Sequence, residues 1–179
     1  TLKGIDPLTG LANRSFFTSD LNTLITNRPT TLPFYIVIFD IDDMKGINML
    51  QGHASGDSLL KQISIIFSDF ASENQKFYRL GDDEFSLLYT EPEYVKFASY
   101  IKDLFCVFSC YHISISAGIS SFPVDSINIS NLVKFAELAL RHVKENGKNA
   151  FLSFNKSMYH TYINHCTIKQ NMLKALNAN

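Results

Sequence analysis

The feature that most constrains the fold is the continuous apolar run Phe-Tyr-Ile-Val-Ile-Phe at residues 34–39. Within a strand predicted over 32–41, such a run is typical of burial on both faces, so we expect this strand at the centre of a sheet. The run ends in an acidic cluster that contains Asp40, Asp42 and Asp43. Carboxylates at the end of a buried strand are costly unless they are paired or bind a metal ion. The pattern therefore favours a functional site at this strand end.

A second acidic cluster, Asp-Asp-Glu at 82–84, lies further along the chain. It is flanked by β-prone runs at 77–80 and 85–89, which predict a β-hairpin. The pair Gly81-Asp82 suits a type II′ turn, which takes glycine first and accepts aspartate second. Three adjacent carboxylates repel one another, and a divalent metal ion is the first candidate to neutralise them. A solvated acidic turn is the alternative.

The remaining hydrophobic periodicity alternates helices with strands. Helices are predicted over 14–27 after an Asn13 cap, and over 55–71, 91–108, 131–146 and 156–176, with two further strands over 111–121 and 151–154. We expect residues 44–56 to be irregular, because three glycines interrupt them. This order of elements indicates an α/β sandwich with one central mixed sheet.

The composition limits the classes of function. A length of 179 residues fits one domain with a short appended element, and a hydrophobic fraction of 46% is sufficient for a core. The 16 Lys and Arg against 17 Asp and Glu indicate neither a nucleic-acid partner nor direct membrane contact. Three cysteines without a CxxC pair, and no signal-like or membrane-spanning run, favour a reducing, cytoplasmic setting. The chain starts at Thr1 and reads as an excised fragment, so we expect sensor or membrane segments upstream.

The two acidic clusters meet at one edge if the strand at 32–41 and the hairpin are neighbours in one sheet. Carboxylates from both clusters would then form a hard-oxygen site for Mg²⁺, or for Mn²⁺ in its place. Because Mg²⁺ shares its ligand shell with substrate phosphates, such a site points to nucleotide phosphate chemistry. Lys144 and Lys148 are four residues apart and share one face of a predicted helix, where they could bind phosphate. The alternative is a solvated helix end whose cations suit the helix dipole.

Several segments carry a family resemblance. They are DPLTGLANR at 6–14, FDIDDMKGIN at 39–48, GHASGD at 52–57, RLGDDEF at 79–85, SAG at 116–118, and AELAL at 136–140 followed by Lys144, Gly147 and Lys148. In this order they resemble the GGDEF domain of the diguanylate cyclase family, over about residues 5–154.

The resemblance implies a fold related to nucleotide cyclases and polymerase palms. This is an α/β domain with a central, mixed and mainly antiparallel sheet flanked by helices. In active members of the family, two such domains each hold one GTP, face each other and make cyclic di-GMP. GTP and a second copy of the chain are therefore the partners that the resemblance implies.

The resemblance also implies the residues of a metal site. Asp40 and Asp83 would hold Mg²⁺, helped by the main-chain carbonyl of Ile41. Glu84 would lie beside the metal, which makes Asp83 and Glu84 the implied catalytic residues.

Four further residues would bind GTP if the resemblance holds. Asn48 and Asp57 would recognise guanine, and Lys144 and Lys148 would contact the phosphates. The chemistry agrees, because the Asn48 amide offers a donor and an acceptor to a base edge, and the Asp57 carboxylate accepts from guanine N–H groups. For Asn48 alone, a turn-forming asparagine is the alternative.

The hairpin departs from the family at one position. Gly81 and Asp82 stand where two glycines of the signature let the backbone approach GTP, and the Asp82 side chain takes up that space. Its charge adds repulsion from the polyphosphate, about 4 kcal/mol for unit charges 4 Å apart at an effective dielectric of ~20, and ~1 kcal/mol in water. The upper figure is roughly a thousandfold loss in affinity or rate. Milder departures are Met49, Glu137, Arg141 and Val143, and the Arg-x-x-Asp product-inhibition motif is absent at 72–75.

The C-terminal segment is assigned separately from the domain. We assign residues 1–154 to the GGDEF domain and 155–179 to a helix that resembles the linker leading into an EAL phosphodiesterase domain. An ordinary amphipathic tail helix is the alternative.

Three functions follow from these patterns. The first is a degenerate GGDEF domain that binds GTP with Mg²⁺ weakly or not at all and regulates an attached EAL phosphodiesterase domain. The second is a working diguanylate cyclase, and the third is an interaction module without a nucleotide.

Overall fold

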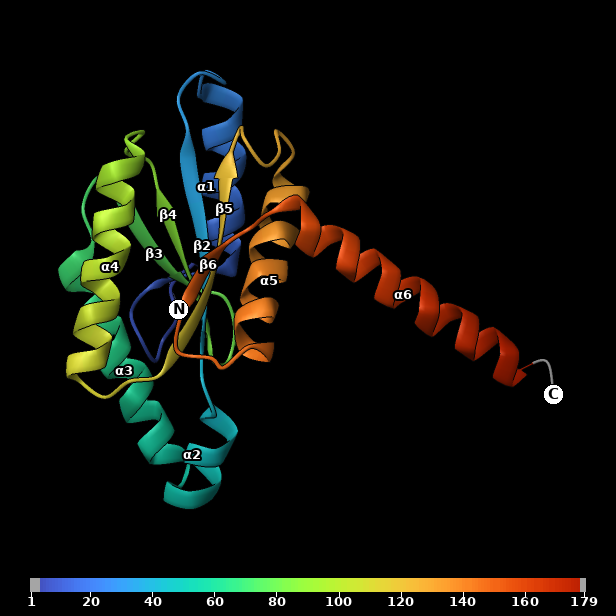
Figure 1. Ribbon diagram of the computed structural model, residues 1–179. Coiled ribbons are helices and arrows are strands. Elements are labelled where there is room, and N and C mark those ends of the chain that lie inside the picture. Colours follow the sequence, from blue (N-terminus) through green and yellow to red (C-terminus); the bar gives the residue numbers. More distant parts are fainter. Residues whose placement is uncertain (1–3, 178–179) are drawn as a thin grey trace.

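A six-stranded sheet with the order β1-β3-β4-β2-β5-β6 forms the middle of the molecule (Figure 1). The structure is a computed structural model and describes residues 4–177. The strands are β1 (Ala12–Asn13), β2 (Phe34–Ile41), β3 (Gln75–Arg79), β4 (Glu84–Tyr89), β5 (Ile115–Phe122) and β6 (Phe151–Ser153). The helices are α1 (Arg14–Asn27), α2 (Met44–Gln51), α3 (His53–Phe70), α4 (Tyr94–Cys110), α5 (Ile129–Glu145) and α6 (Lys156–Asn177).

The apolar strand β2 lies at the centre, as its sequence predicts. All of its residues are buried, and it pairs antiparallel with β4 on one side and with β5 on the other. Parallel pairs, β1 with β3 and β5 with β6, occur only towards the edges. The expected α/β fold with a mixed, mainly antiparallel sheet is therefore confirmed.

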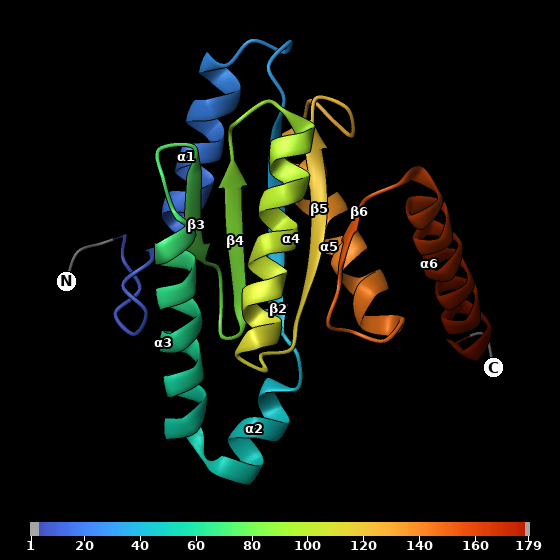
Figure 2. The same cartoon turned by 60° about the vertical axis from the view of Figure 1, so that its left-hand side comes forward.

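Alternate residues of β2 serve two separate cores. Tyr35, Val37, Phe39 and Ile41 pack against α3 and α4, whereas Phe34, Ile36 and Ile38 pack against α1 and α5. This follows from the two-residue period of a strand. The sheet is thus covered on both faces, with α3 and α4 in one layer and α1 and α5 in the other (Figure 2).

The expectation that residues 44–56 are irregular is wrong. They form α2 and the first turn of α3, separated by Gly52. Met44 at the start of α2 is buried in the core, and a Cβ placed on Gly56 of α3 would lie only 2.0 Å from Asn48 Oδ1. This close packing of α2 on α3 outweighs the helix-propensity cost of Gly46, which is about 1 kcal/mol.

The hairpin is confirmed, but its turn is not of type II′. The pairing of β3 with β4 ends at Arg79 and Phe85, and the Leu80 N–H donates to the Glu84 carbonyl over 2.8 Å. Gly81 is not among the described glycines with positive φ, which a type II′ turn requires at its first position. The reason is the register, which leaves more residues in the loop than a two-residue turn can hold.

Helix boundaries agree with the sequence where a cap defines them. Asn13 and Asn128 cap α1 and α5 through their side-chain oxygens. Gly147, with φ +115°, lies just beyond the end of α5, where the left-handed region favours glycine. By contrast, α4 begins at Tyr94, so the acidic residues at 91–93 precede the helix instead of forming its first turn.

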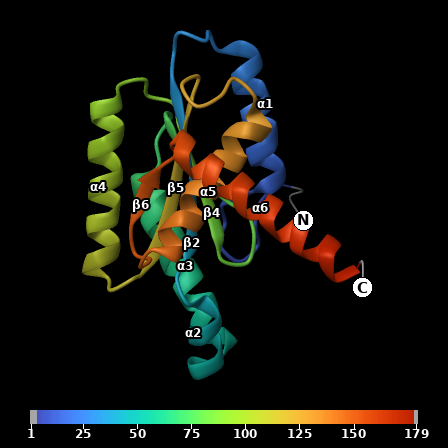
Figure 3. The same ribbon diagram turned by 45° about the vertical axis from the view of Figure 1, so that its right-hand side comes forward.

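Helix α6 follows β6 and points away from the sheet on the α5 side (Figures 1 and 3). The helix begins at Lys156, and residues 178–179 of the segment assigned to 155–179 lie outside the described residues. Among residues 4–177, no helix has the length and apolar character needed to cross a bilayer.

Candidate functional site

The two acidic clusters meet at one end of the sheet. Asp40 of β2 is the register partner of Glu84 of β4, and the Ile41 N–H donates to the Asp83 carbonyl over 3.1 Å. Asp40 and Glu84, which are far apart in the sequence, are therefore neighbours in the sheet, as expected. By the alternation of β2, Asp40 belongs to the face covered by α1 and α5.

Asp40 is a buried carboxylate with a lysine partner. Only 9% of the residue is exposed, and its Oδ1 forms an ion pair with Lys144 Nζ from α5. Burial raises the pKa of Asp40 above its ordinary value, the Lys144 hydrogen bond opposes the rise, and the nearby Asp83 and Glu84 charges add to it. This strand end therefore concentrates negative charge, and Lys144 directs a positive charge at it.

The raised pKa of Asp40 predicts a pH dependence of stability. The folded protein holds this proton more tightly than the unfolded chain, whose carboxyl titrates near 3.8. The protonated Asp40 carboxyl therefore makes its full contribution to the free energy of unfolding below pH 3.8. This contribution is lost as the pH rises through the raised pKa of the folded state. Denaturant unfolding with EDTA should show wild type losing stability relative to Asp40→Asn across this window. Parallel pH profiles would contradict the assignment.

Asp42 stabilises the end of β2 through hydrogen bonds within the protein. It is 4% exposed, and its carboxylate accepts from Ser114 Oγ (2.7 Å), Ser116 Oγ (2.8 Å) and the Asn149 N–H (3.0 Å). These donors come from the start of β5 and from the loop before β6. Asp42 therefore ties three segments together beside Asp40.

Replacing Asp42 with asparagine should destabilise the domain by about 2 kcal/mol, because one amide oxygen cannot accept from three donors, of which Ser116 is buried. The matched control is Asp43→Asn, since Asp43 is its exposed neighbour and pairs only at the surface with Lys148. That control should cost less than about 1 kcal/mol. Urea unfolding of both variants measures the difference, and equal costs would refute the role given to Asp42.

Lys148 does not share a helical face with Lys144, so that expectation is wrong. Helix α5 ends at Glu145, and Lys148 follows Gly147 in a left-handed conformation, with φ 62°. Its Nζ lies 2.6 Å from Asp43 Oδ1. Both lysines still reach the acidic end of β2, but by separate routes, one from the helix and one from the loop that follows it.

The residues expected to recognise guanine lie on α2 and α3, which extend beyond the same end of the sheet (Figures 1 and 2). The Asn48 side chain packs against Gly56, which is the residue before Asp57. The Asn48 side chain on α2 therefore lies beside the backbone of α3 that carries Asp57. Asn48 Oδ1 is buried and has no hydrogen-bond donor among the described protein atoms. Asp57 is exposed. The structure thus presents an unpaired acceptor next to a free carboxylate.

Two arginines that carried no role in the sequence interpretation hold the hairpin. Arg79 donates to the Gly81 and Asp82 carbonyls and pairs with Asp6 over 2.9 Å. Arg14 of α1 contacts Glu84 Oε2 at 3.1 Å. These cations supply part of the positive charge for which a metal was the first candidate. Their presence in the motifs at 6–14 and 79–85 was the available signal.

Asp82 itself is exposed at the tip of the loop. Its main-chain carbonyl is held by Arg79, whereas Glu84 faces the Asp40 side of the sheet. Burial raises the pKa of Glu137 of α5 above its ordinary value, and the charge of Glu84 adds to the rise. The signature residues therefore separate into an inward acidic edge and an outward Asp82.

The chemistry of the donor set fits a shared metal shell. Within residues 4–177, no group of three or more His, Cys, Asp and Glu side chains is arranged to hold a metal ion. Mg²⁺, however, often takes one or two carboxylates and completes its shell with waters and substrate phosphates. Asp40 and Asp83, with the Ile41 carbonyl, are a set of that kind.

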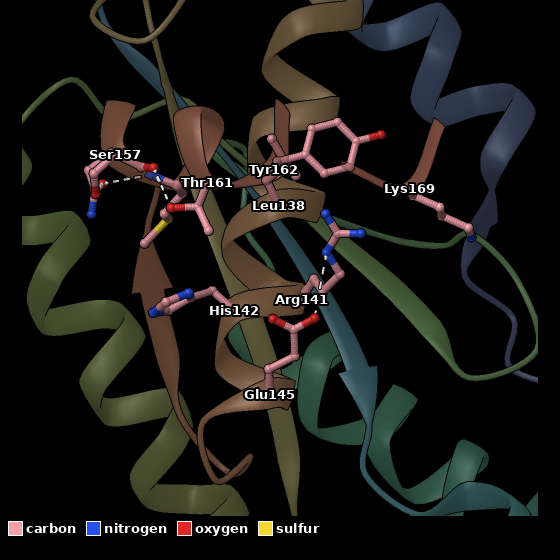
Figure 4. Close-up of a pocket in the computed structure, with 10 residues that line it drawn as sticks. Leu138, Arg141, His142, Glu145, Ser157, Thr161, Tyr162 and Lys169 are labelled. Atoms are coloured by element: carbon pink, nitrogen blue, oxygen red, sulfur yellow. Dashed lines mark hydrogen bonds and ion pairs between the residues drawn. The ribbon is translucent and has the colours of Figure 1, made fainter. Parts of the chain in front are cut away.

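A separate hollow of about 550 Å³ lies between α5 and α6 (Figure 4). The buried Leu138 and Met158 line it, together with the exposed Arg141, His142 and Lys169. None of the predicted site residues lines it. It is therefore distinct from the acidic edge.

Fold and site together define the class as a palm-like cyclase domain with an acidic strand end beside a hairpin. A profile of the diguanylate cyclase GGDEF domain matches residues 3–150, so the chain belongs to the GGDEF family and to cyclic di-GMP signalling. The fold agrees with solved GGDEF domains. That of TpbB (YfiN) from Pseudomonas aeruginosa has a TM-score of 0.82 and 22% identity, covering 88% of this chain and 98% of that one. That of DgcB from Caulobacter crescentus, solved with c-di-GMP, has a TM-score of 0.76 and 22% identity, covering 84% and 95%.

Two Escherichia coli relatives are similar in sequence. Diguanylate cyclase DgcN is 43% identical over 83 residues, which are 46% of this chain and 20% of the relative. Cyclic di-GMP phosphodiesterase PdeR is 25% identical over 183 residues, which are 98% of this chain and 28% of the relative. This chain thus spans less than a third of the length of either relative.

Proposed function

We propose that this domain binds GTP together with Mg²⁺ and regulates an attached phosphodiesterase domain, with cyclase activity that is weak or absent. The observation that carries GTP binding is Asn48 Oδ1, a buried acceptor without a donor in the described protein. An unsatisfied buried acceptor costs about 1–3 kcal/mol, and an N–H of a bound base would relieve that cost. Asp57 beside it suits the other N–H groups of guanine.

The acidic edge supports binding of the phosphates. Asp40 and Asp83, with the Ile41 carbonyl, would hold Mg²⁺, which supplies positive charge to the triphosphate. Lys144 and Lys148 are presented at the same strand end by their contacts with Asp40 and Asp43. Exchange of these carboxylate partners for phosphate oxygens would keep both lysines neutralised. Glu84 would remain beside the metal, where Arg14 holds it.

The restriction on cyclase activity rests on Asp82. Arg79 fixes the backbone carbonyls of Gly81 and Asp82, so the loop cannot easily withdraw to make room for a nucleotide. If the triphosphate approaches this loop closely, as the family resemblance implies, it would meet the Asp82 side chain and its negative charge. The exposed position of Asp82 favours the second candidate, an active cyclase that forms cyclic di-GMP from two GTP molecules in a homodimer, because an exposed carboxylate can rotate into solvent.

Calorimetry with GTP, ATP and Mg²⁺ tests the binding proposal. We expect GTP to bind, ATP to bind much more weakly, and Asn48→Ala and Asp57→Ala to lose the preference for GTP. The absence of GTP binding would leave an interaction module. Chromatography of the same mixtures measures cyclic di-GMP, and formation well above the enzyme-free blank would establish the active cyclase instead.

The regulatory part of the proposal is supported by the relative PdeR. Its similarity covers 98% of this chain, including most of α6, and its name describes a cyclic di-GMP phosphodiesterase. We therefore assign α6 to the connection with an EAL domain. Hydrolysis of cyclic di-GMP by the polypeptide that contains both domains should change when GTP is added, and it should not change in the Asp57→Ala variant.

A further inference from the structure

Helix α4 carries two free thiols on its outer face. Cys106 and Cys110 are both exposed and neither forms a disulfide. The buried stripe of this helix contains Leu104 and Phe108, and each cysteine follows one of them by two residues. Two residues correspond to about 200° around a helix, so both thiols project away from the core.

The spacing of this pair suits a bridging atom better than a direct bond. Residues four apart on a helix have Cβ atoms about 5–6 Å apart, whereas a disulfide needs about 3.8 Å. A bound soft ion adds two bonds of about 2.3 Å, as for a metal thiolate, and spans the gap without unwinding the turn. Cys110 is also the last residue of α4, where the negative end of the helix dipole favours a bound cation.

We propose that Cys106 and Cys110 form a bidentate site for a thiophilic ion, such as trivalent arsenic or a soft metal ion that accepts two thiolates. The site shares no residue with the proposed GTP site, whose side chains come from α2, α3, α5, the ends of β2 and β4 and the loops beside them. It is nevertheless connected to the acidic edge. Four residues after Cys110, Ser114 donates its hydroxyl to Asp42. A bridge across the last turn of α4 would therefore steady the turn that leads to this contact.

Phenylarsine oxide is the probe, used on the folded chain with Cys166→Ser to remove the third cysteine. In the reaction two As–S bonds form, the As–O bond breaks, and the oxygen leaves as water with both thiol protons. Arsenic remains trivalent, so no oxidant is needed. Native mass spectrometry should show one arsenical per chain that a dithiol removes and a monothiol does not. Hydrogen exchange of the amides at 110–114 should slow on binding.

Single substitution of Cys106→Ser or Cys110→Ser should weaken binding by at least about a hundredfold, because two-point attachment is lost. The matched control is Lys102→Cys combined with Cys106→Ser. It keeps two exposed thiols on one helical face, but about 12 Å apart along the axis. This control should bind as weakly as the single variants. Tight binding by the control, or no tight binding by the parent chain, would overturn the proposal.

Discussion

Gly118→Ala is expected to destabilise the domain by about 3 kcal/mol, at the upper part of the range for overpacked cores. Gly118 lies in β5 beneath α5. A Cβ there would lie 2.0 Å from the Ala136 carbonyl oxygen and 2.2 Å from the Leu140 amide nitrogen. Both atoms belong to the backbone of α5, so no side chain can rotate away. The helix itself has to move, and it carries Lys144 away from Asp40. Urea unfolding measures the loss.

The matched control for this prediction is Gly46→Ala. Gly46 is helical, and a Cβ added to it meets no atom within 4 Å. The same substitution should therefore stabilise the domain by up to about 1 kcal/mol, through helix propensity alone. If both variants change stability in the same direction by similar amounts, close approach of β5 and α5 is not what requires glycine at 118.

Asp82→Gly should raise the affinity for GTP with Mg²⁺ by about fivefold, and by up to roughly a thousandfold if the site excludes water on binding. The lower figure corresponds to repulsion of about 1 kcal/mol in water and the upper to about 4 kcal/mol at an effective dielectric of 20. Since Asp82 is exposed in the free domain, the lower figure is the expected minimum. Calorimetry measures the affinity, and chromatography measures the cyclic di-GMP that the variant should form faster than wild type.

Asp82→Asn separates the two causes. It keeps the side chain and removes its charge, so it should recover the electrostatic part of the gain and leave the steric part. A gain in both variants assigns the defect to charge, whereas a gain in Asp82→Gly alone assigns it to space. Unchanged or weaker GTP binding in Asp82→Gly would show that this position does not restrict the site.

Most of the fold could be predicted because the relevant signals are local. The apolar run at 34–39 indicates burial on both faces, and that property places β2 at the centre whatever its neighbours are. The predicted cap at Asn13 likewise depends only on the turn that follows it. Residues 44–56 were missed because α2 exists through its packing on α3, which outweighs its glycines. Packing against another helix leaves no clear periodic pattern in so short a segment.

Part of the candidate site could also be predicted, because its motifs are local signals in the sequence. The motifs indicated which residues belong to it, and the register of β2 with β4 brings Asp40 and Glu84 together as expected. The partners of those residues were not predictable from spacing. Arg14 and Glu84 are 70 residues apart, and Lys148 and Asp43 are 105 apart. The helical spacing of the two lysines was misleading, because α5 ends before the second one.

The sequence by itself therefore determined the central strand, most of the helices and strands, and the set of acidic, amide and basic residues that identify the family. Only the tertiary structure decided how the carboxylates divide their roles. The Asp42 carboxylate accepts three hydrogen bonds. Asp40 pairs with Lys144 and Glu84 pairs with Arg14, whereas Asp82 is exposed. The physical reason is that burial along an element follows from its own periodicity, whereas the partner of a charge depends on which distant segment the packed core places beside it.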